Sequence, residues 1–146
     1  MPPLIRRYVK TSFVFLLAGL VLGGYIVIST FVVGARPSPL LITAHVHLLL
    51  VGFMLTLVIG VATWMFPRPA RDDARYRPEL AEAVYWIMTV STIARASAEI
   101  GLALVGGTGS LRLVVAGGGL GQLAAAALFV VNMWSRVRMP SVTPPR

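Results

Sequence analysis

The chain has 146 residues, of which 57% are hydrophobic and 12% charged, and it contains no cysteine. Soluble domains are about 45–50% apolar and about 25% charged, so this composition excludes an ordinary soluble domain, and the lack of cysteine excludes disulfides and thiolate chemistry. The net charge of +8 does not indicate nucleic acid, because the basic residues stand beside apolar runs, where they fix topology and meet anionic headgroups.

Four apolar runs, each long enough to cross a bilayer as a helix, follow one another along the chain. They cover residues 11–34, 40–66, 81–105 and 111–134. The first run is longer than the apolar core of a signal peptide, which spans about 7–15 residues, so we predict a retained helix. Backbone groups in lipid must find partners within their own segment. The sequence therefore predicts an all-α, four-helix transmembrane bundle that forms one domain over residues 1–146.

Basic residues predict how this bundle is oriented. Three precede the first run, four follow the second and three stand in the C-terminal tail, whereas the other two connections carry only Arg36 and Arg112. The positive-inside rule then places both termini and the middle connection in the cytoplasm. Trp64, Trp86 and Trp134 fall near the same side, where aromatic belts form. We expect a multi-pass protein of the cell (inner) membrane, surrounded by lipid.

The only two histidines, His45 and His47, lie inside the second run. Ionisable residues at such depth are rare and usually functional, although hydrogen bonds to neighbouring helices are the alternative. Residues two apart on a helix point about 200° from each other, so both rings cannot bind one metal ion from one helix. A lone zinc ion needs three or four protein ligands, which the chain lacks. Heme needs only one or two axial ligands and an apolar slot.

Further residues are predicted at the depth of the histidines: Tyr25, Arg95, Glu99 and the glycines 117–119 all fall within about one helical turn of them. Arg95 either holds a ligand carboxylate, such as a heme propionate, or pairs with Glu99 at i, i+4. Gly118 and its neighbours either let a flat macrocycle lie on bare backbone or allow close helix packing. Tyr25 is either a packing residue or a redox or proton group.

Four more side chains have weaker indications. Arg112, at the outer edge of the fourth run, either caps propionates from the aqueous side or extends toward the headgroups. Gln122 lies one turn from the glycines and is expected to make a hydrogen bond between helices. Met54 and Met65 are thioethers away from histidine depth, where methionine usually fills the core.

The segment Ala44-His45-Val46-His47, followed by an apolar stretch that ends Trp64-Met65-Phe66-Pro67, resembles a helix of the heme-copper oxidase catalytic subunit. This superfamily includes the C-type oxidases and the nitric oxide reductases, and the chain looks like a short relative made of one four-helix unit. In the family, the two histidines of this motif ligate two different hemes on opposite sides of the helix. The resemblance thus implies His45 and His47 as ligands of heme iron.

The resemblance covers one helix of four and has clear departures. The three further histidines of the family's copper site are missing, and so is the histidine from another helix that completes the low-spin heme. Oxygen reduction by this chain alone is therefore not expected. A homodimer would supply the missing ligand, because two-fold symmetry can bring a histidine of one protomer opposite a histidine of the other.

Our leading hypothesis is a membrane protein that binds heme b near a homodimer interface, for electron transfer with a redox partner or for binding a diatomic gas. The alternative is a non-catalytic accessory or assembly subunit of a respiratory membrane complex, without its own cofactor. A proton or quinone pathway through Glu99 and Arg95 is a third reading, for which no chain of relaying groups is visible in the cytoplasmic half. No nucleic acid partner is predicted.

Overall fold

The computed structural model describes residues 1–66, 77–106, 109–134 and 136–137. Every regular element in these ranges is a helix, and the elements are α1 (Pro3–Phe31), α2 (Pro39–Val46), the π-helix η1 (His47–Leu55), α3 (Thr56–Met65), α4 (Pro78–Val105) and α5 (Gly109–Trp134). α2, η1 and α3 form one continuous rod, Pro39–Met65. By length and composition, this rod, α1, α4 and α5 can each cross a membrane. The predicted all-α fold with four transmembrane helices is confirmed.

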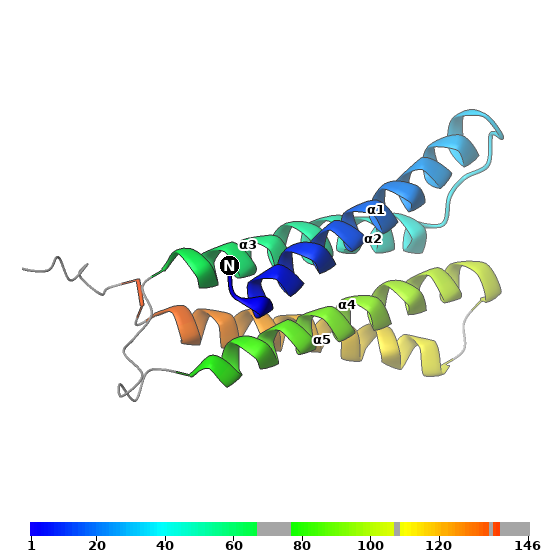
Figure 1. Cartoon of the computed structure of the whole chain (residues 1–146). Coiled ribbons are helices and arrows are strands. Elements are labelled where there is room, and N and C mark those ends of the chain that lie inside the picture. Colours follow the sequence, from blue (N-terminus) through cyan, green and yellow to red (C-terminus); the bar gives the residue numbers. More distant parts are fainter. Residues whose placement is uncertain (67–76, 107–108, 135, 138–146) are drawn as a thin grey trace, which may run out of the picture.

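The four long helices are arranged as two hairpins that pack against each other (Figure 1). α1 packs along the rod formed by α2, η1 and α3, and α5 packs along α4. The two hairpins meet mainly where α2 and η1 contact α4, and α4 also contacts α3 and α1. The far end of α1 leans away from the other helices (Figure 1). The rod thus lies between α1 and α4, with most of its contacts to α4 in its first half.

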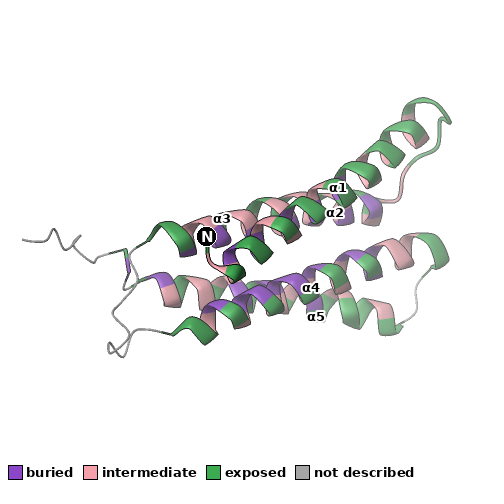
Figure 2. Cartoon of the chain, in the orientation of Figure 1, coloured by how far each residue is buried: buried purple, intermediate pink, exposed green. Residues whose placement is uncertain are grey.

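Buried residues line the contacts between helices, whereas the outer faces are exposed and apolar (Figure 2). The main core cluster joins Tyr8, Ile59, Met88 and Ala125, which come from four different helices. The exposed large side chains include Leu17 and Val21 on α1 and Leu120 and Leu123 on α5. An apolar exterior around satisfied helical backbones is the arrangement that a bilayer requires.

α1 begins at Pro3, not near residue 11 as the apolar run predicted. Proline is favoured at the first position of a helix because the N–H that it lacks would have no intrahelical partner there. Ile5 and Tyr8 are buried in these early turns, and the Tyr8 hydroxyl donates to the Ala81 carbonyl of α4 at 2.9 Å. Arg6 and Arg7 point outward. The charged N-terminal segment is therefore already helical, with Ile5 and Tyr8 packed on the face opposite to the arginines.

The end of the bundle that holds the start of α4 is closed by an arginine. Arg136, two residues beyond α5, donates from Nη2 to the carbonyl oxygens of Thr63 at 3.0 Å and Phe66 at 2.9 Å. These carbonyls belong to the last turn of α3, where helices leave backbone acceptors unpaired. Trp64 and Trp134 are exposed near this end. Most basic residues of the middle connection and tail lie outside the described residues: Arg68, Arg71, Arg75, Arg138 and Arg146.

Candidate functional site

The two histidines point to opposite neighbours, as their spacing predicted. Nδ1 of His45 lies 2.8 Å from the carbonyl oxygen of Gly19 on α1. Nδ1 of His47 lies 2.9 Å from the carbonyl oxygen of Thr43, one turn earlier in its own helix. The same nitrogen of His47 lies 3.6 Å from Oε2 of Glu99 on α4. The rod therefore directs the His45 ring toward α1 and the His47 ring toward α4.

The π-helix η1 begins at His47. Its widened turns end at Thr56, whose backbone N–H bonds to the Val51 carbonyl five residues earlier, and whose hydroxyl donates to the same oxygen at 3.0 Å. π-helical turns are uncommon and occur often at functional sites. The apolar pattern of this run gave no signal for η1, because hydropathy records which residues are buried and not how the backbone hydrogen bonds are spaced.

His45 is packed against a bare stretch of α1. A Cβ added at Gly23 would lie 2.6 Å from Cε1 of His45, so only glycine fits beneath the ring. Gly19 and Gly23 are four residues apart, which puts both on one face of α1. Small residues at this spacing let two membrane helices approach closely. The pair Gly19 and Gly23 thus allows α1 to pack closely against the rod at the level of His45.

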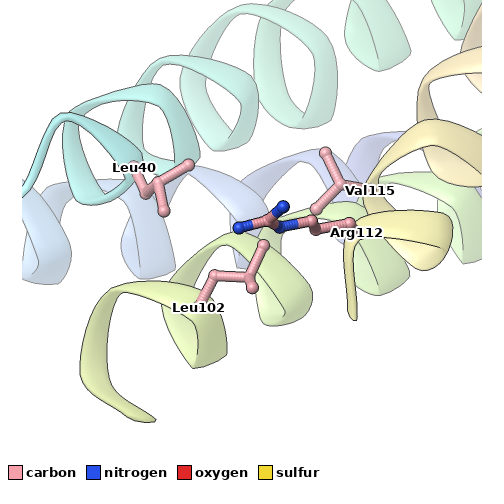
Figure 3. A pocket seen from close by; sticks show the side chains of 4 residues that line it. All are labelled: Leu40, Leu102, Arg112 and Val115. Atoms are coloured by element: carbon pink, nitrogen blue, oxygen red, sulfur yellow. The ribbon is translucent and has the colours of Figure 1, made fainter. Parts of the chain in front are cut away.

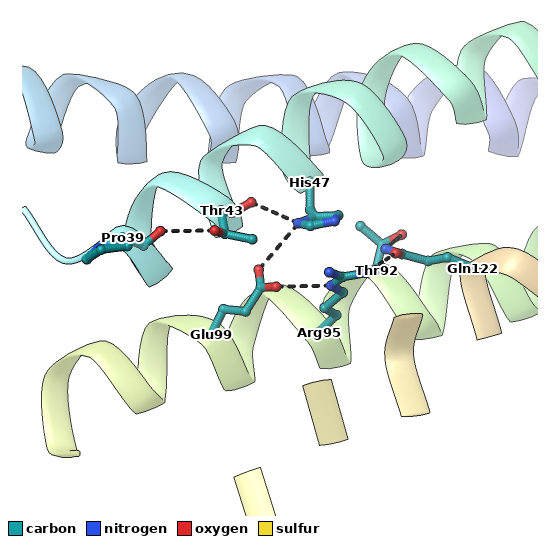
Figure 4. Close-up of polar contacts among 7 residues, drawn as sticks. All are labelled: Pro39, Thr43, His47, Thr92, Arg95, Glu99 and Gln122. Carbon is teal, nitrogen blue, oxygen red and sulfur yellow. Dashed lines mark hydrogen bonds and ion pairs between the residues drawn. The ribbon is translucent and has the colours of Figure 1, made fainter. Parts of the chain in front are cut away.

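Glu99 is the most buried charged residue among those predicted for the site, with its side chain 1% exposed. Its Oε1 accepts a 3.0 Å hydrogen bond from Nε of Arg95, one turn earlier on α4, so the predicted i, i+4 pair is confirmed. Its Oε2 faces His47 and has no hydrogen-bond partner in the described part of the chain. Figure 4 shows the carboxylate joined by dashed lines to the arginine and to the imidazole.

A chain of hydrogen bonds continues from Arg95 to α5. Nη1 of Arg95 donates to Oε1 of Gln122 at 3.2 Å, and Nε2 of Gln122 donates to the hydroxyl of Thr92 at 3.2 Å (Figure 4). The helix–helix hydrogen bond predicted for Gln122 is confirmed. A polar cluster therefore joins the rod, α4 and α5; Thr92, Glu99 and Gln122 are buried in it, and His47 and Arg95 are partly buried.

The glycines of α5 serve helix packing in this cluster. A Cβ added at Gly118 would lie 2.8 Å from Cβ of Arg95 and 2.9 Å from the Ser91 carbonyl oxygen. A Cβ added at Gly119 would lie 3.0 Å from Nη1 of Arg95. Gly117, by contrast, faces open space. Arg95 thus covers the backbone at Gly118, which the sequence had also offered as a surface for a flat macrocycle.

Arg112 lines a pocket at the end of the bundle where α2 and α5 begin and α4 ends. The pocket has a volume of about 460 Å³ and is lined by Leu40, Leu102, Val115 and Arg112. Figure 3 shows the guanidinium of Arg112 extending into the space between the apolar side chains. In the part of the chain that the structure describes, no hydrogen bond or ion pair engages Arg112. The pocket thus combines apolar walls with one available cation.

Tyr25, a predicted candidate, and the two methionines that the sequence did not favour as ligands stand apart from this cluster. Tyr25 is 53% exposed on α1, and Met54 and Met65 are also exposed. Gly23 faces His45, so Tyr25, two positions later, points about 200° away from the rod. Sequence reasoning missed Thr92, the Thr43 carbonyl and the glycine pair of α1. The first lacked any signal, but the i−4 carbonyl and the i, i+4 glycine spacing were both readable.

The residues that the structure describes contain no group of three or more His, Asp or Glu side chains placed to hold a metal ion. Comparison of the chain with models of known protein families, with curated proteins and with solved structures finds no match.

Proposed function

We propose that the chain is a membrane protein that binds heme b through a histidine of the Ala-His-Val-His helix. The observation that supports this most is the hydrogen bonding of the two rings: Nδ1 of His45 and of His47 each lies within 2.9 Å of a backbone carbonyl oxygen. A carbonyl only accepts, so the hydrogen sits on Nδ1 in the neutral ring and the lone pair sits on Nε2. Metal-ligating histidines are usually oriented in this way.

His47 is the stronger candidate for the iron ligand. Its side chain keeps 18% exposure, and it faces α4, on the side of the rod where the Arg112 pocket also opens. His45 instead lies against Gly23 with no space between ring and backbone. A heme on His45 would have to fit beside α1, whose Gly19 carbonyl oxygen already lies 2.8 Å from the ring. The family resemblance implies both histidines, and the packing favours His47.

The pocket beside Arg112 suits the polar edge of a heme. Leu40, which lines it, precedes His47 by seven residues, about 10 Å along the helix. The pocket volume of about 460 Å³ is within the range of small-molecule sites, about 300–1,000 Å³. A guanidinium without a protein partner binds carboxylates by charge-assisted hydrogen bonds. Arg112 is thus the better partner for propionates, because Arg95 is already engaged by Glu99 and Gln122.

Bound heme would supply one-electron redox chemistry when both axial positions are filled, or an open iron position for a diatomic gas when one is free. In either case the chain's own residues do the holding: His47 presents Nε2, the Thr43 carbonyl fixes the ring, and Arg112 neutralises an anionic edge. A homodimer that brings two histidines to one iron remains our proposal for the filled state. A monomer with a six-coordinate heme would contradict the dimer.

A second candidate function is that of an accessory subunit without a cofactor. It is favoured by the internal pairing of the polar cluster, in which Arg95 binds Glu99 and Gln122, and Gln122 binds Thr92, across α4 and α5. In that case the two histidines would act only as hydrogen-bonding groups between helices. Both candidates predict the same bundle, so the test must measure the cofactor itself.

The experiment is the visible spectrum of the purified protein, oxidised and reduced, with a pyridine hemochromogen assay. We expect a b-type reduced spectrum that is lost or shifted in His47→Ala and retained in the control Met54→Leu, which changes an exposed thioether on the same rod. His45→Ala then shows whether the second ring contributes. Carbon monoxide shifts the reduced spectrum only if one iron position is open. A colourless protein from heme-replete cells would overturn the proposal and favour the accessory role.

A further inference from the structure

Glu99 and His47 face each other inside the bundle, and their contact supports an inference that rests on the proposed function. We propose that Glu99 is a positioning residue for His47. Together with the Thr43 carbonyl, its carboxylate keeps the ring hydrogen on Nδ1, so that Nε2 is the nitrogen presented to heme iron. Glu99 itself would not touch the heme in this role.

The first step is the unpaired oxygen of the carboxylate. Glu99 is 1% exposed, and its Oε1 is occupied by Arg95 at 3.0 Å. Its Oε2 is buried and has no hydrogen-bond partner among the described residues. Buried acceptors without a partner are rare, because such an atom has lost water and gained nothing. Nδ1 of His47 lies 3.6 Å from Oε2.

The second step is the nitrogen that faces this oxygen. Nδ1 of His47 has two acceptors before it, the Thr43 carbonyl at 2.9 Å and Oε2 of Glu99 at 3.6 Å. A hydrogen on Nδ1 donates to the Thr43 carbonyl and turns positive charge toward Oε2, whereas the other tautomer would set a lone pair against two oxygens. At 3.6 Å the carboxylate acts through its charge. A shift of the ring by about 0.7 Å would make it a charge-assisted hydrogen bond.

The third step is the fixed orientation of Glu99. Arg95 is the charged group that faces it from its own helix, and Arg95 is held by Gln122 of α5, which is held by Thr92. The carboxylate therefore cannot rotate away from the rod without breaking this chain. Glu82 provides a contrast, because it pairs with Arg7 at 3.2 Å but both side chains are about half exposed. Glu82 is a matched control for the loss of one paired carboxylate.

The test is the tautomer of His47, measured by ¹⁵N NMR on the full-length, histidine-labelled protein prepared without heme. The chain has two histidines, so a His45→Gln sample assigns the resonances. In Glu99→Gln, Arg95 Nε–H keeps the amide oxygen, which turns the amide NH₂ toward Nδ1. Two donors would then oppose each other. We expect bare Nε2 in the wild type and in Glu82→Gln, and a population shift toward Nε2–H in Glu99→Gln.

Each outcome decides the matter. A Glu99→Gln ring spectrum identical to that of the wild type would overturn the positioning role. If that variant does not accumulate, Glu99→Asp keeps the charge but withdraws it by one methylene. Glu99→Asp should then shift the Nδ1 resonance of His47 while Nε2 stays without a hydrogen. An unchanged resonance would also overturn the positioning role of Glu99. The NMR measurement needs no heme. If the wild type binds no heme, the proposed function is wrong, but the tautomer result for Glu99 is unaffected, so the two failures are distinguishable.

Discussion

The contact between Arg95 and Gly118 allows a quantitative test of how the polar cluster is held. Gly118→Ala places a methyl group 2.8 Å from Cβ of Arg95 and 2.9 Å from the Ser91 carbonyl. Neither atom is the flexible end of a side chain, so α4 and α5 must separate. Gly117→Ala adds the same methyl one residue earlier, where nothing lies within 4 Å. The pair of variants isolates the helix contact.

The magnitude follows from this pairing. Both substitutions gain the helix propensity of alanine, about 0.5–1 kcal/mol, and this gain cancels in the comparison. What remains is the cost of overpacking, about 1–3 kcal/mol. We therefore expect Gly118→Ala to be less stable than Gly117→Ala by about 1–3 kcal/mol, a factor of about 5 to 150 in the unfolding equilibrium.

The assay is unfolding of the purified protein by a denaturing detergent, followed by tryptophan fluorescence. Two of the three tryptophans, Trp86 and Trp134, lie on α4 and α5, and Trp64→Phe as a common background restricts the signal to the hairpin that the substitution strains. Because Arg95 holds Glu99, the same variant should also disturb the His47 resonances, and Gly117→Ala should not. Equal midpoints for the two variants would refute the reasoning, since the close approach at Gly118 would then carry no free energy.

Three further predictions concern other parts of the chain. Arg112→Gln should weaken heme binding about 10-fold, near the lower end of what a hydrogen bond to a charged group contributes, because Arg112 is exposed; spectral titration with Arg36→Gln as the control measures this, and equal affinities would contradict it. Arg136→Met removes two donors from the last carbonyls of α3 and should lower the unfolding free energy by about 2 kcal/mol in the detergent assay; an unchanged midpoint would show that these bonds are replaced by water. For the predicted orientation, cysteines introduced at Pro2 and at Ala35 should differ in whole cells, where an impermeant thiol reagent should label only the second; labelling of the first alone would reverse the topology.

The sequence was informative wherever a single helix determines the answer. Each bilayer crossing needs about 20 apolar residues, so four crossings could be counted directly. The divergence of His45 and His47 follows from a spacing of two, and the pairing of Arg95 with Glu99 follows from a spacing of four. These relations involve one helix each and need no knowledge of its neighbours.

Rotation of each helix about its axis could not be predicted in the same way. The helical rise predicted Tyr25 near the depth of the histidines. The face of α1 that contacts the rod, however, is the one with Gly19 and Gly23, and Tyr25 lies on the opposite face. Tyr25 is consequently exposed. The hydrogen bond between Arg95 and Gln122 also depends on how α4 and α5 are rotated. Depth is encoded along one chain segment, whereas rotation is decided by the surfaces of two segments together.

The ion pair of α4 explains why the site and the fold depend on each other. A lone charge within a bilayer is costly, and Arg95 and Glu99 relieve this cost by pairing within one helix. The local pair still leaves donors on the guanidinium and one oxygen on the carboxylate. Gln122 of α5 accepts a hydrogen bond from the guanidinium at 3.2 Å, and Nδ1 of His47 faces the remaining carboxylate oxygen at 3.6 Å. The need to satisfy one buried ion pair therefore sets α5 and the histidine-bearing rod on either side of α4.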